Sequence, residues 1–273
     1  HPTTWGNYNN HVFRDWIRMR SDSVADHVKI IKEVVGDIPL MTCCSSTGPI
    51  ALNAISLDLE KMMKHLDLVM LENCGMNVNT VNWYRMEAEA LQQKDIAKKM
   101  GNAPAIALSY TVYDIGGYLG WCLSRFWGVG NWSSTLPGRF PVDPADGKEI
   151  HEIIGPINNW EEKYSDLHPA DGHDVIEVRL ASNRYCRENG WRDEQGFEHW
   201  NKVSAWSVEL LKNNIGYRFV RAEELSDSEA LKSEKIPLIL DSLACISDDQ
   251  YSAITDYLAA GGIVWLNLPF GTH

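Results

Sequence analysis

The feature that most constrains the fold is a strand–helix–strand pattern between residues 38 and 75. Residues 38–42 and 68–71 are short apolar runs bounded by glycine and polar residues, as is typical of strands buried on both faces. Between them, apolar residues recur at helical spacing over residues 57–66. A unit of this length places its two strands parallel to each other. The sequence therefore predicts a βαβ unit here.

Polar residues follow both predicted strands. Thr42 to Ser46 come after the first strand, and Glu72 and Asn73 come directly after the second. In parallel α/β folds the functional residues gather where the strands end at their C-terminal side. These two places are therefore the first candidates for a functional site.

The same alternation extends over the first 165 residues. Helices are expected at 11–35, 80–100, 115–127 and 148–163, and further strands at 105–108 and 129–132. Four parallel strands with intervening helices amount to about half of an eight-stranded (β/α) TIM barrel. A half-barrel leaves open sheet edges, and the chain begins at His1 without an initiator methionine. We therefore expect a piece of a longer protein.

A second alternation follows a linker-like stretch at residues 166–174. Strands are expected at 175–180, 217–220, 236–240 and 262–267, and helices at 197–212, 222–232 and 247–259. The last helix has a clear start at Ser247 and ends at Gly261. The predicted fold class is thus α/β, with a partial barrel at 1–165 and an open, doubly wound domain at 174–273.

Composition limits the partners. The net charge of −12 over 273 residues argues against nucleic acid and anionic membranes, which select basic surfaces. No apolar run approaches the length of a membrane span. The six cysteines lack the spacing of a metal site, so we expect no metal, no cofactor, and free buried thiols in a cytoplasmic protein. The 11 tryptophans and 10 tyrosines fit either sugar-stacking surfaces or a core rich in aromatic rings.

Several stretches resemble glycoside hydrolase family 42, the β-galactosidases with a barrel and a C-terminal trimerisation domain. FRDWIRMRSDSVADHVKIIKEV resembles the helix before barrel strand five, DLVMLEN the end of strand six, and APAIALS strand seven. KIPLILDSLACISDDQYSAITDYLAAGGIVWLN resembles the domain related to class I glutamine amidotransferases that makes these enzymes trimers. The resemblance implies a half-barrel that acts on a β-galactoside-type carbohydrate, in a homotrimer.

The sequence also departs from this family at the catalytic positions. Its members use two glutamates, an acid/base after strand four and a nucleophile after strand seven. The resemblance places the first upstream of His1 and the second at Ser109, which is not a carboxylate. Retaining hydrolysis needs a carboxylate that forms and releases a glycosyl intermediate. Two functions therefore stay open: a glycoside hydrolase, and a catalytically inactive carbohydrate-binding or assembly protein. An unrelated enzyme on the same barrel is a third, since a fold does not give chemistry.

Glu72 is the candidate catalytic residue, because a charge directly after an apolar strand is costly unless it faces a cleft. A capping or ion-paired glutamate is the alternative. Candidate substrate-binding residues lie at or just after the expected strand ends: Asn73, Ser109, Tyr110, Asp114, Asn131 and Trp132.

Each of these has a structural alternative. Asn73 fits a turn, Asp114 fits the start of helix 115–127, and Trp132 fits a core position. Tyr110 is a further candidate nucleophile, by analogy with sialidases. In the second domain, Cys186 and Cys245 lack the flanking glycines of a nucleophile turn, so we expect no catalysis there.

Overall fold

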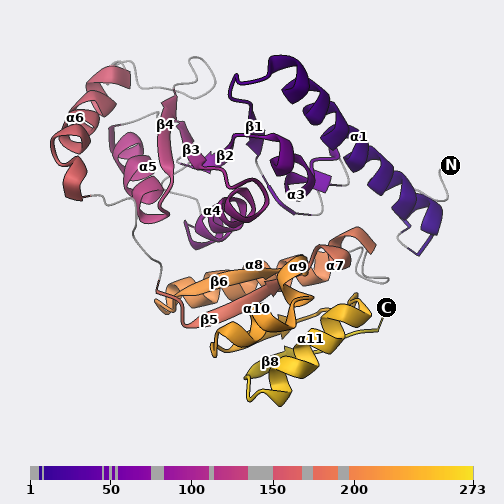
Figure 1. Ribbon diagram of the computed structural model, residues 1–273. Helices are drawn as coiled ribbons and strands as arrows, with labels where there is room; N and C mark the ends of the chain where they lie inside the picture. Colours follow the sequence, from indigo (N-terminus) through magenta and orange to yellow (C-terminus); the bar gives the residue numbers. More distant parts are fainter. Residues whose placement is uncertain are drawn as a thin grey trace. The chain divides into compact units, whose positions relative to one another are not determined.

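The computed structural model describes residues 6–7, 9–44, 46–48, 51–52, 55–74, 83–110, 114–134, 150–167, 175–189 and 197–272. The chain divides into two compact units. The first contains residues 28–46 and 59–173, and the second contains residues 1–27, 47–58 and 174–273. Each unit has a four-stranded parallel sheet, so the architecture is mixed α/β (Figure 1). The domain limits expected from the sequence, 1–165 and 174–273, stay a prediction.

The sheet of the first unit has the strand order β1-β2-β3-β4, with all neighbours parallel. Its strands are β1 (Met41–Cys44), β2 (Leu68–Cys74), β3 (Ala105–Tyr110) and β4 (Gly130–Ser134). Val69, Leu71 and Ala107 are almost fully buried, as the unbroken apolar runs predicted. The register between β2 and β3 shifts after Leu71.

Helices follow the strands of this first sheet, with α4 and α5 close to its central strands (Figure 1). The helical elements within residues 11–167 are α1 (His11–Val35), α3 (Leu59–Met62), η1 (Met63–His65), α4 (Trp83–Ile96), η2 (Ala97–Gly101), α5 (Asp114–Phe126), α6 (Ile150–Lys163) and η4 (Ser165–Leu167). The bounds of α1 match the prediction, because its apolar residues keep one face over 25 residues. The helix expected over 57–66 is shorter, and Ser56 adopts a positive φ of 62° before it.

The sheet of the second unit has the order β6-β5-β7-β8, again all parallel. Its strands are β5 (Val178–Ser182), β6 (Tyr217–Arg221), β7 (Leu238–Asp241) and β8 (Val264–Asn267). Its helices are α7 (Arg184–Asn189), α8 (Phe197–Lys212), α9 (Ala222–Leu225), α10 (Ser228–Ser233) and α11 (Asp248–Ala259). Ala181, Val220 and Leu240 from three strands pack with Ile254 of α11 in one core.

One helix expected from the sequence is divided in two. Asp227 interrupts residues 222–232 with an extended backbone, and its side chain accepts hydrogen bonds at 3.0 Å from the amides of Glu229 and Ala230. This is an N-cap, which satisfies two free amides at the start of α10. The expectation of a single helix was therefore wrong, because the capping aspartate outweighs the apolar spacing.

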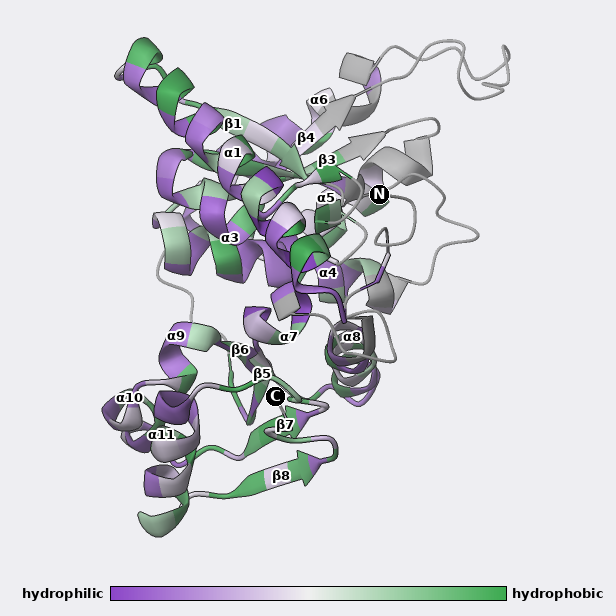
Figure 2. Cartoon of the chain, turned by 90° about the vertical axis from the view of Figure 1, so that its right-hand side faces the viewer, coloured by the Kyte–Doolittle hydropathy of each residue, from purple (hydrophilic) through white to green (hydrophobic). Residues whose placement is uncertain are grey.

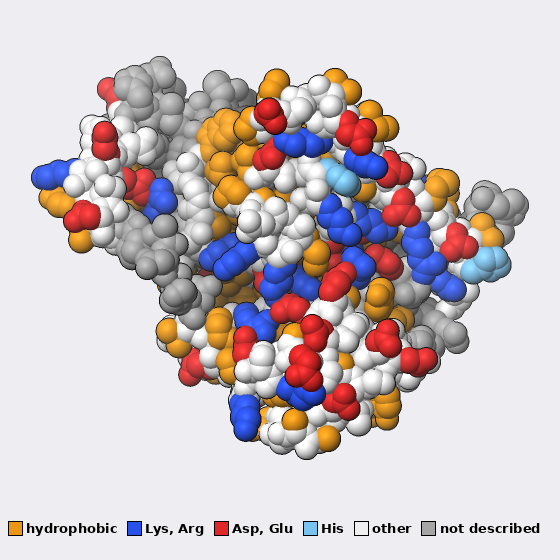
Figure 3. Space-filling view, in the orientation of Figure 1, with side chains coloured by type: hydrophobic (Ala, Val, Ile, Leu, Met, Phe, Trp, Pro, Cys, Tyr) orange, Lys and Arg blue, Asp and Glu red, His pale blue; other side chains and the backbone are white. Residues whose placement is uncertain are grey.

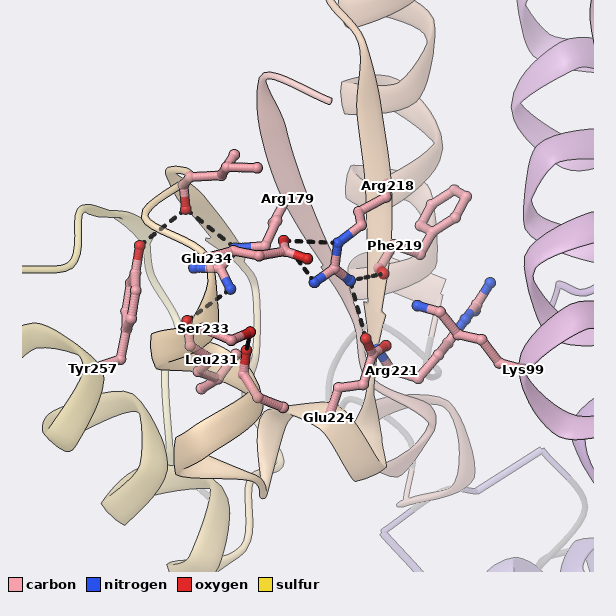
Figure 4. A network of polar contacts seen from close by, with 12 residues as sticks. Lys99, Arg179, Arg218, Phe219, Arg221, Glu224, Leu231, Ser233, Glu234 and Tyr257 are labelled. Atoms are coloured by element: carbon pink, nitrogen blue, oxygen red, sulfur yellow. Dashed lines mark hydrogen bonds and ion pairs between the residues drawn. The ribbon is translucent and has the colours of Figure 1, made fainter. Parts of the chain in front are cut away.

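Arginine side chains hold the β6 side of the second sheet together (Figure 4). Arg218 forms ion pairs with Glu224 at 3.0 Å and with Glu234 at 2.9 Å, which join the strand to α9 and to the loop before β7. Arg179 on β5 is fully buried and donates to the backbone oxygens of Ile236 at 3.1 Å and Leu231 at 2.9 Å.

Tyr257 of α11 completes this network. Its ring lies 4.8 Å from the Arg179 guanidinium, and its hydroxyl donates to the Ile236 oxygen at 2.9 Å and accepts from the Ile263 amide at 3.2 Å. Gly262 passes so close to this ring that a Cβ there would overlap it. At the opposite edge of the sheet, Trp265 of the largely apolar strand β8 is 44% exposed (Figure 2).

On the face drawn in Figure 3, acidic and basic side chains are interspersed, and no large patch carries charge of a single sign. Among the described residues, no helix is both long and apolar enough to cross a membrane.

Candidate functional site

The C-terminal ends of β1 to β4 share one edge, because all four strands run parallel. Glu72 lies near the end of β2, and Ser109 and Tyr110 end β3. Ser109 pairs in register with Cys74 of β2 and with Ser133 of β4. We call this edge the rim. The structure thus brings the backbone of the predicted positions on β2 and β3 to one place.

The expected end of β4 at Asn131 and Trp132 was wrong. The strand continues to Ser134, so Asn131 lies level with Ala107 and Trp132 with Leu108. Successive strand residues point to opposite faces of a sheet, so these two side chains cannot line the same surface. Trp132 is 48% exposed, whereas Asn131 is partly buried. The prediction failed because Ser133 and Ser134 were taken as loop residues.

Glu72 has a neighbour on β1 that the sequence did not predict, Cys43. Cys43 lies level with Met70 across the sheet, and its Sγ is 3.8 Å from the Met70 Sδ. Two residues farther along β2 lies Glu72, whose carboxylate influences the pKa of this thiol. Burial, followed by the neighbouring carboxylate of Glu72, raises the pKa of Cys43 to about 11. The thiol therefore stays protonated at neutral pH and remains a donor.

The neighbouring Cys44 is a different kind of group. It is fully buried, and its Sγ lies 3.4 Å from the backbone oxygen of Ser46. Burial, followed by the charge of Glu89, raises the pKa of Cys44 to about 12. Glu89 itself accepts a hydrogen bond from Gln93 at 3.1 Å within α4. The expectation of buried thiols holds for Cys44 and fails for Cys43, which is exposed.

A second carboxyl of α4 also stands out. Glu87 is buried, and this burial raises its pKa to about 7. It therefore exchanges a proton near neutral pH.

The side chains of Asn73, Ser109, Tyr110 and Asp114 lie outside the described part of the chain, so their predicted contacts with a substrate stay predictions. Glu72 is partly buried, and its side chain lies within the described part of the chain.

The second unit contains a buried polar cluster around His199. The His199 Nε2 accepts from the Asn183 amide at 3.0 Å, and its Nδ1 lies 2.8 Å from the backbone oxygen of Asp241. These contacts fix the neutral tautomer with the proton on Nδ1. Burial lowers the pKa of His199, against a smaller opposite effect of Asp241. His199 was not singled out from the sequence, because a lone histidine in a helix carries no pattern.

Cys186 and Cys245 meet in this same cluster although 59 residues separate them in sequence. The Cys186 Sγ lies 3.4 Å from both the backbone nitrogen and the backbone oxygen of Cys245. The neighbouring thiol and burial raise the pKa of Cys186 well above its usual value. A protonated, buried thiol is a poor nucleophile, which fits the structural role expected for both residues. Within the described ranges, no group of three or more His, Cys, Asp or Glu side chains is arranged to hold a metal ion.

Comparison with solved structures finds a similar fold. The cold-adapted β-galactosidase from Rahnella sp. R3 matches 92% of this chain with a TM-score of 0.60. The chain spans 40% of the length of that protein, and 15% of the matched residues are identical. At that identity the likeness shows the fold alone. No family model matches the chain, and no curated protein matches it.

Proposed function

We propose that this chain is a glycoside hydrolase-like protein that acts on β-galactoside-type or related carbohydrates through the rim of β1 to β4. The observation that carries the proposal is the position of Glu72, a carboxylate at the C-terminal rim of a parallel sheet, in a fold similar to that of a β-galactosidase. Carbohydrate sites combine such carboxylates with hydrogen-bonding side chains, and Asn73 and Ser109 are the proposed sugar-binding partners.

The proposed architecture is the C-terminal half of a TIM barrel followed by an amidotransferase-like trimerisation domain. Four parallel strands in consecutive order support the first part. In the second sheet the chain order of the strands is 2-1-3-4, an order that belongs to open, doubly wound sheets. We propose a homotrimer because the second domain resembles a trimerisation domain.

The proposed role of Glu72 is to stabilise the positive charge that develops on the sugar ring, or to act as base or nucleophile. A retaining mechanism needs a second carboxyl group about 5–5.5 Å away. The family resemblance assigns the acid/base glutamate to the end of barrel strand four. Ser109 can contribute hydrogen bonds, and these are worth less than the charge of a carboxylate.

A second candidate function is carbohydrate binding without hydrolysis. The observation that favours it is Ser109, the last residue but one of β3, where the family resemblance calls for a nucleophilic glutamate. A hydroxyl without an adjacent base cannot replace that carboxylate.

Two measurements separate these functions. Hydrolysis of a panel of nitrophenyl glycosides by the complete protein should be greatest for the β-galactoside if the first proposal holds. Titration of galactose and lactose, followed by tryptophan fluorescence, should give saturable binding in both cases. Binding without hydrolysis would select the second function, and the absence of both would reject the rim as a carbohydrate site.

A further inference from the structure

Four aromatic residues form a continuous row across α5 and α6, two helices that lie side by side (Figure 1). Tyr118 and Trp121 are three residues apart on α5, so they share one helix face. Trp160 of α6 lies four residues before Tyr164, which directly follows the end of that helix. The ring centroids of Trp121 are 5.8 Å from those of both Tyr118 and Trp160. Trp160 and Tyr164 are 5.2 Å apart. We call these four residues the aromatic row.

The contacts between the two helices leave part of the row open. Trp121 and Tyr164 are partly buried. Tyr118 is still 56% exposed and Trp160 42% exposed after all of these ring contacts. Trp127, directly after α5, shows the other use of an aromatic side chain, since it is 2% exposed and belongs to the core. Exposed apolar groups that adjoin one another, unlike single ones, mark a binding surface.

Glu161 of α6 places polar groups beside the row. Its carboxylate accepts hydrogen bonds from the Trp121 Nε1 at 2.7 Å and from the Arg125 Nη2 at 2.8 Å. The first bond fixes the plane of the Trp121 ring, and the ion pair with Arg125 cancels the charge of the carboxylate. The Lys163 ammonium lies 4.9 Å from the centre of the Tyr164 ring and covers one of its faces. The row is therefore held in place by polar contacts on two of its four rings.

We infer that the aromatic row is a second carbohydrate-binding surface, which takes a neutral oligosaccharide. A pyranose has an apolar face of C–H groups and an edge of hydroxyls, so it stacks on an aromatic ring while its hydroxyls reach nearby polar groups. Arg125 and Glu161 supply such groups, and their mutual pairing favours a neutral ligand over an ionic one. The two exposed rings, Tyr118 and Trp160, are separated by Trp121, which favours an oligosaccharide over a single sugar.

This surface is distinct from the proposed site at the rim. The rim consists of strand ends, whereas the row lies on two helices and contains none of the residues proposed for hydrolysis or sugar binding at the rim. Binding at the row needs no catalytic carboxylate. The inference therefore goes beyond the proposed function, and either of the two can fail without the other.

Affinity electrophoresis in native gels that contain galactan, a soluble neutral polysaccharide, measures this binding. Retardation of the chain at increasing galactan concentration gives a dissociation constant. Tyr118→Ala and Trp160→Ala should each weaken binding about three- to tenfold, because each removes one stacking face. Tyr118→Phe keeps the ring and should bind within about twofold of the parent chain. If Trp160→Ala loses its circular dichroism signal, the comparison of the two Tyr118 variants decides the test.

Two residues of the second unit are matched controls. Tyr251 on α11 is 58% exposed and Trp265 on β8 is 44% exposed, close to the values for Tyr118 and Trp160. Tyr251→Ala and Trp265→Ala should leave the dissociation constant unchanged within about twofold. A similar loss in these controls, or no retardation of the parent chain by galactan, would overturn the inference. Stronger retardation by the anionic polygalacturonate than by galactan would overturn the neutral ligand.

A variant of the rim separates the two sites. Glu72→Gln should retain full retardation by galactan, even where it abolishes hydrolysis. Loss of retardation in Glu72→Gln, with normal retardation of Tyr118→Ala, would place the binding at the rim and overturn the inference. Retardation that depends on the row in a protein without glycosidase activity would reject the proposed hydrolysis and support the row.

Sedimentation velocity tests a second copy of the chain as the alternative occupant of the row. The parent chain and Tyr118→Ala should have the same oligomeric state. A change of oligomeric state in Tyr118→Ala, without a change in galactan binding, would show that the row is a contact between copies and would overturn the carbohydrate role.

Discussion

Arg187 of α7 and Asp58 form a buried ion pair across 129 residues of sequence, with the Arg187 Nη2 3.0 Å from the Asp58 Oδ1. The side chain of Asp58 has no exposed surface, and that of Arg187 is 9% exposed. Asp58 belongs to the segment of residues 47–58 that groups with the second sheet. The pair therefore ties a segment from the early part of the chain to the helix that follows β5.

Asp58→Ala should lower the free energy of unfolding by about 3–5 kcal/mol, because it leaves the Arg187 guanidinium buried without its carboxylate. Urea denaturation followed by circular dichroism measures the change. Glu33→Ala is the control: it removes an exposed pair with Lys29 at 3.9 Å and should cost no more than about 0.5 kcal/mol. Similar losses for both variants would contradict the structural role of the buried pair.

Glu72→Gln should reduce hydrolysis by the complete protein about 100- to 10,000-fold, as expected for loss of a catalytic acid or base. Under the proposed function, Ser109→Ala would remove a hydrogen bond to a neutral sugar worth about 0.5–1.5 kcal/mol, or roughly tenfold at most. Steady-state kinetics on the preferred nitrophenyl glycoside compare the two. A loss of only a few-fold from Glu72→Gln in a folded, active protein would exclude the catalytic role of this carboxylate.

His199 should make the second unit less stable in mild acid. Its pKa in the folded chain lies below the usual 6.5, so the folded state holds the neutral ring more strongly than the unfolded state does. This stabilisation is complete above pH 6.5 and is lost as the pH falls toward the folded pKa. The free energy of unfolding of His199→Gln, measured by urea titration, should change less between pH 7.5 and 5.5 than that of the parent chain. Parallel curves for the two proteins would show that the ring does not titrate with folding.

Glu87 should lower the free energy of unfolding as the pH rises, which is the opposite pH dependence to that of His199. Its pKa is raised to about 7, so its contribution to stability is complete below the unfolded value near 4.5 and is lost as the pH rises through 7. Glu87→Gln removes the cost of the buried charge and should raise the free energy of unfolding at pH 8 by about 1–3 kcal/mol. At pH 4.5 the variant and the parent should agree. The exposed Glu209→Gln is the control, with little change expected at either pH.

Gly216→Ala should destabilise the chain by about 3 kcal/mol or more, because a Cβ at Gly216 would overlap the backbone oxygen of Val175. Gly36→Ala provides the comparison. Gly36 has a φ of +60° and open space around its Cβ position, so alanine there meets the backbone cost alone, about 1–2 kcal/mol. Thermal unfolding of both variants measures the difference, and equal melting temperatures would argue against the close approach at Gly216.

Much of the fold could be predicted where a sequence pattern was strong and lay within a single helix or strand. The bounds of α1 and α8 match the expectations from sequence, because long amphipathic faces leave little freedom. The helix α7 was missed, since six residues are too short to show a helical period. The division between α9 and α10 depended on one side chain, Asp227, that can cap a helix or lie on its surface.

The candidate site was predictable only in part. Glu72 could be selected because a charge follows the apolar residues of β2, although the strand itself continues to Cys74. Parallel pairing then fixes the end of the sheet near which it lies. The contact of Cys43 with Met70, two residues before Glu72, depends on the register between β1 and β2, and a register is a property of two strands that neither sequence alone contains. The contact of Cys186 with Cys245 was hidden for the same reason, because distant segments meet only in the folded chain.

The packing of Gly262 against Tyr257 has a consequence for how related sequences can diverge. A side chain at position 262 needs the volume that the Tyr257 ring fills, while the Tyr257 hydroxyl bridges the backbone at Ile236 and Ile263. Neither position can change far while the other stays as it is. Homologous chains should therefore show correlated substitutions at these two positions, with a larger residue at 262 occurring where position 257 has become small.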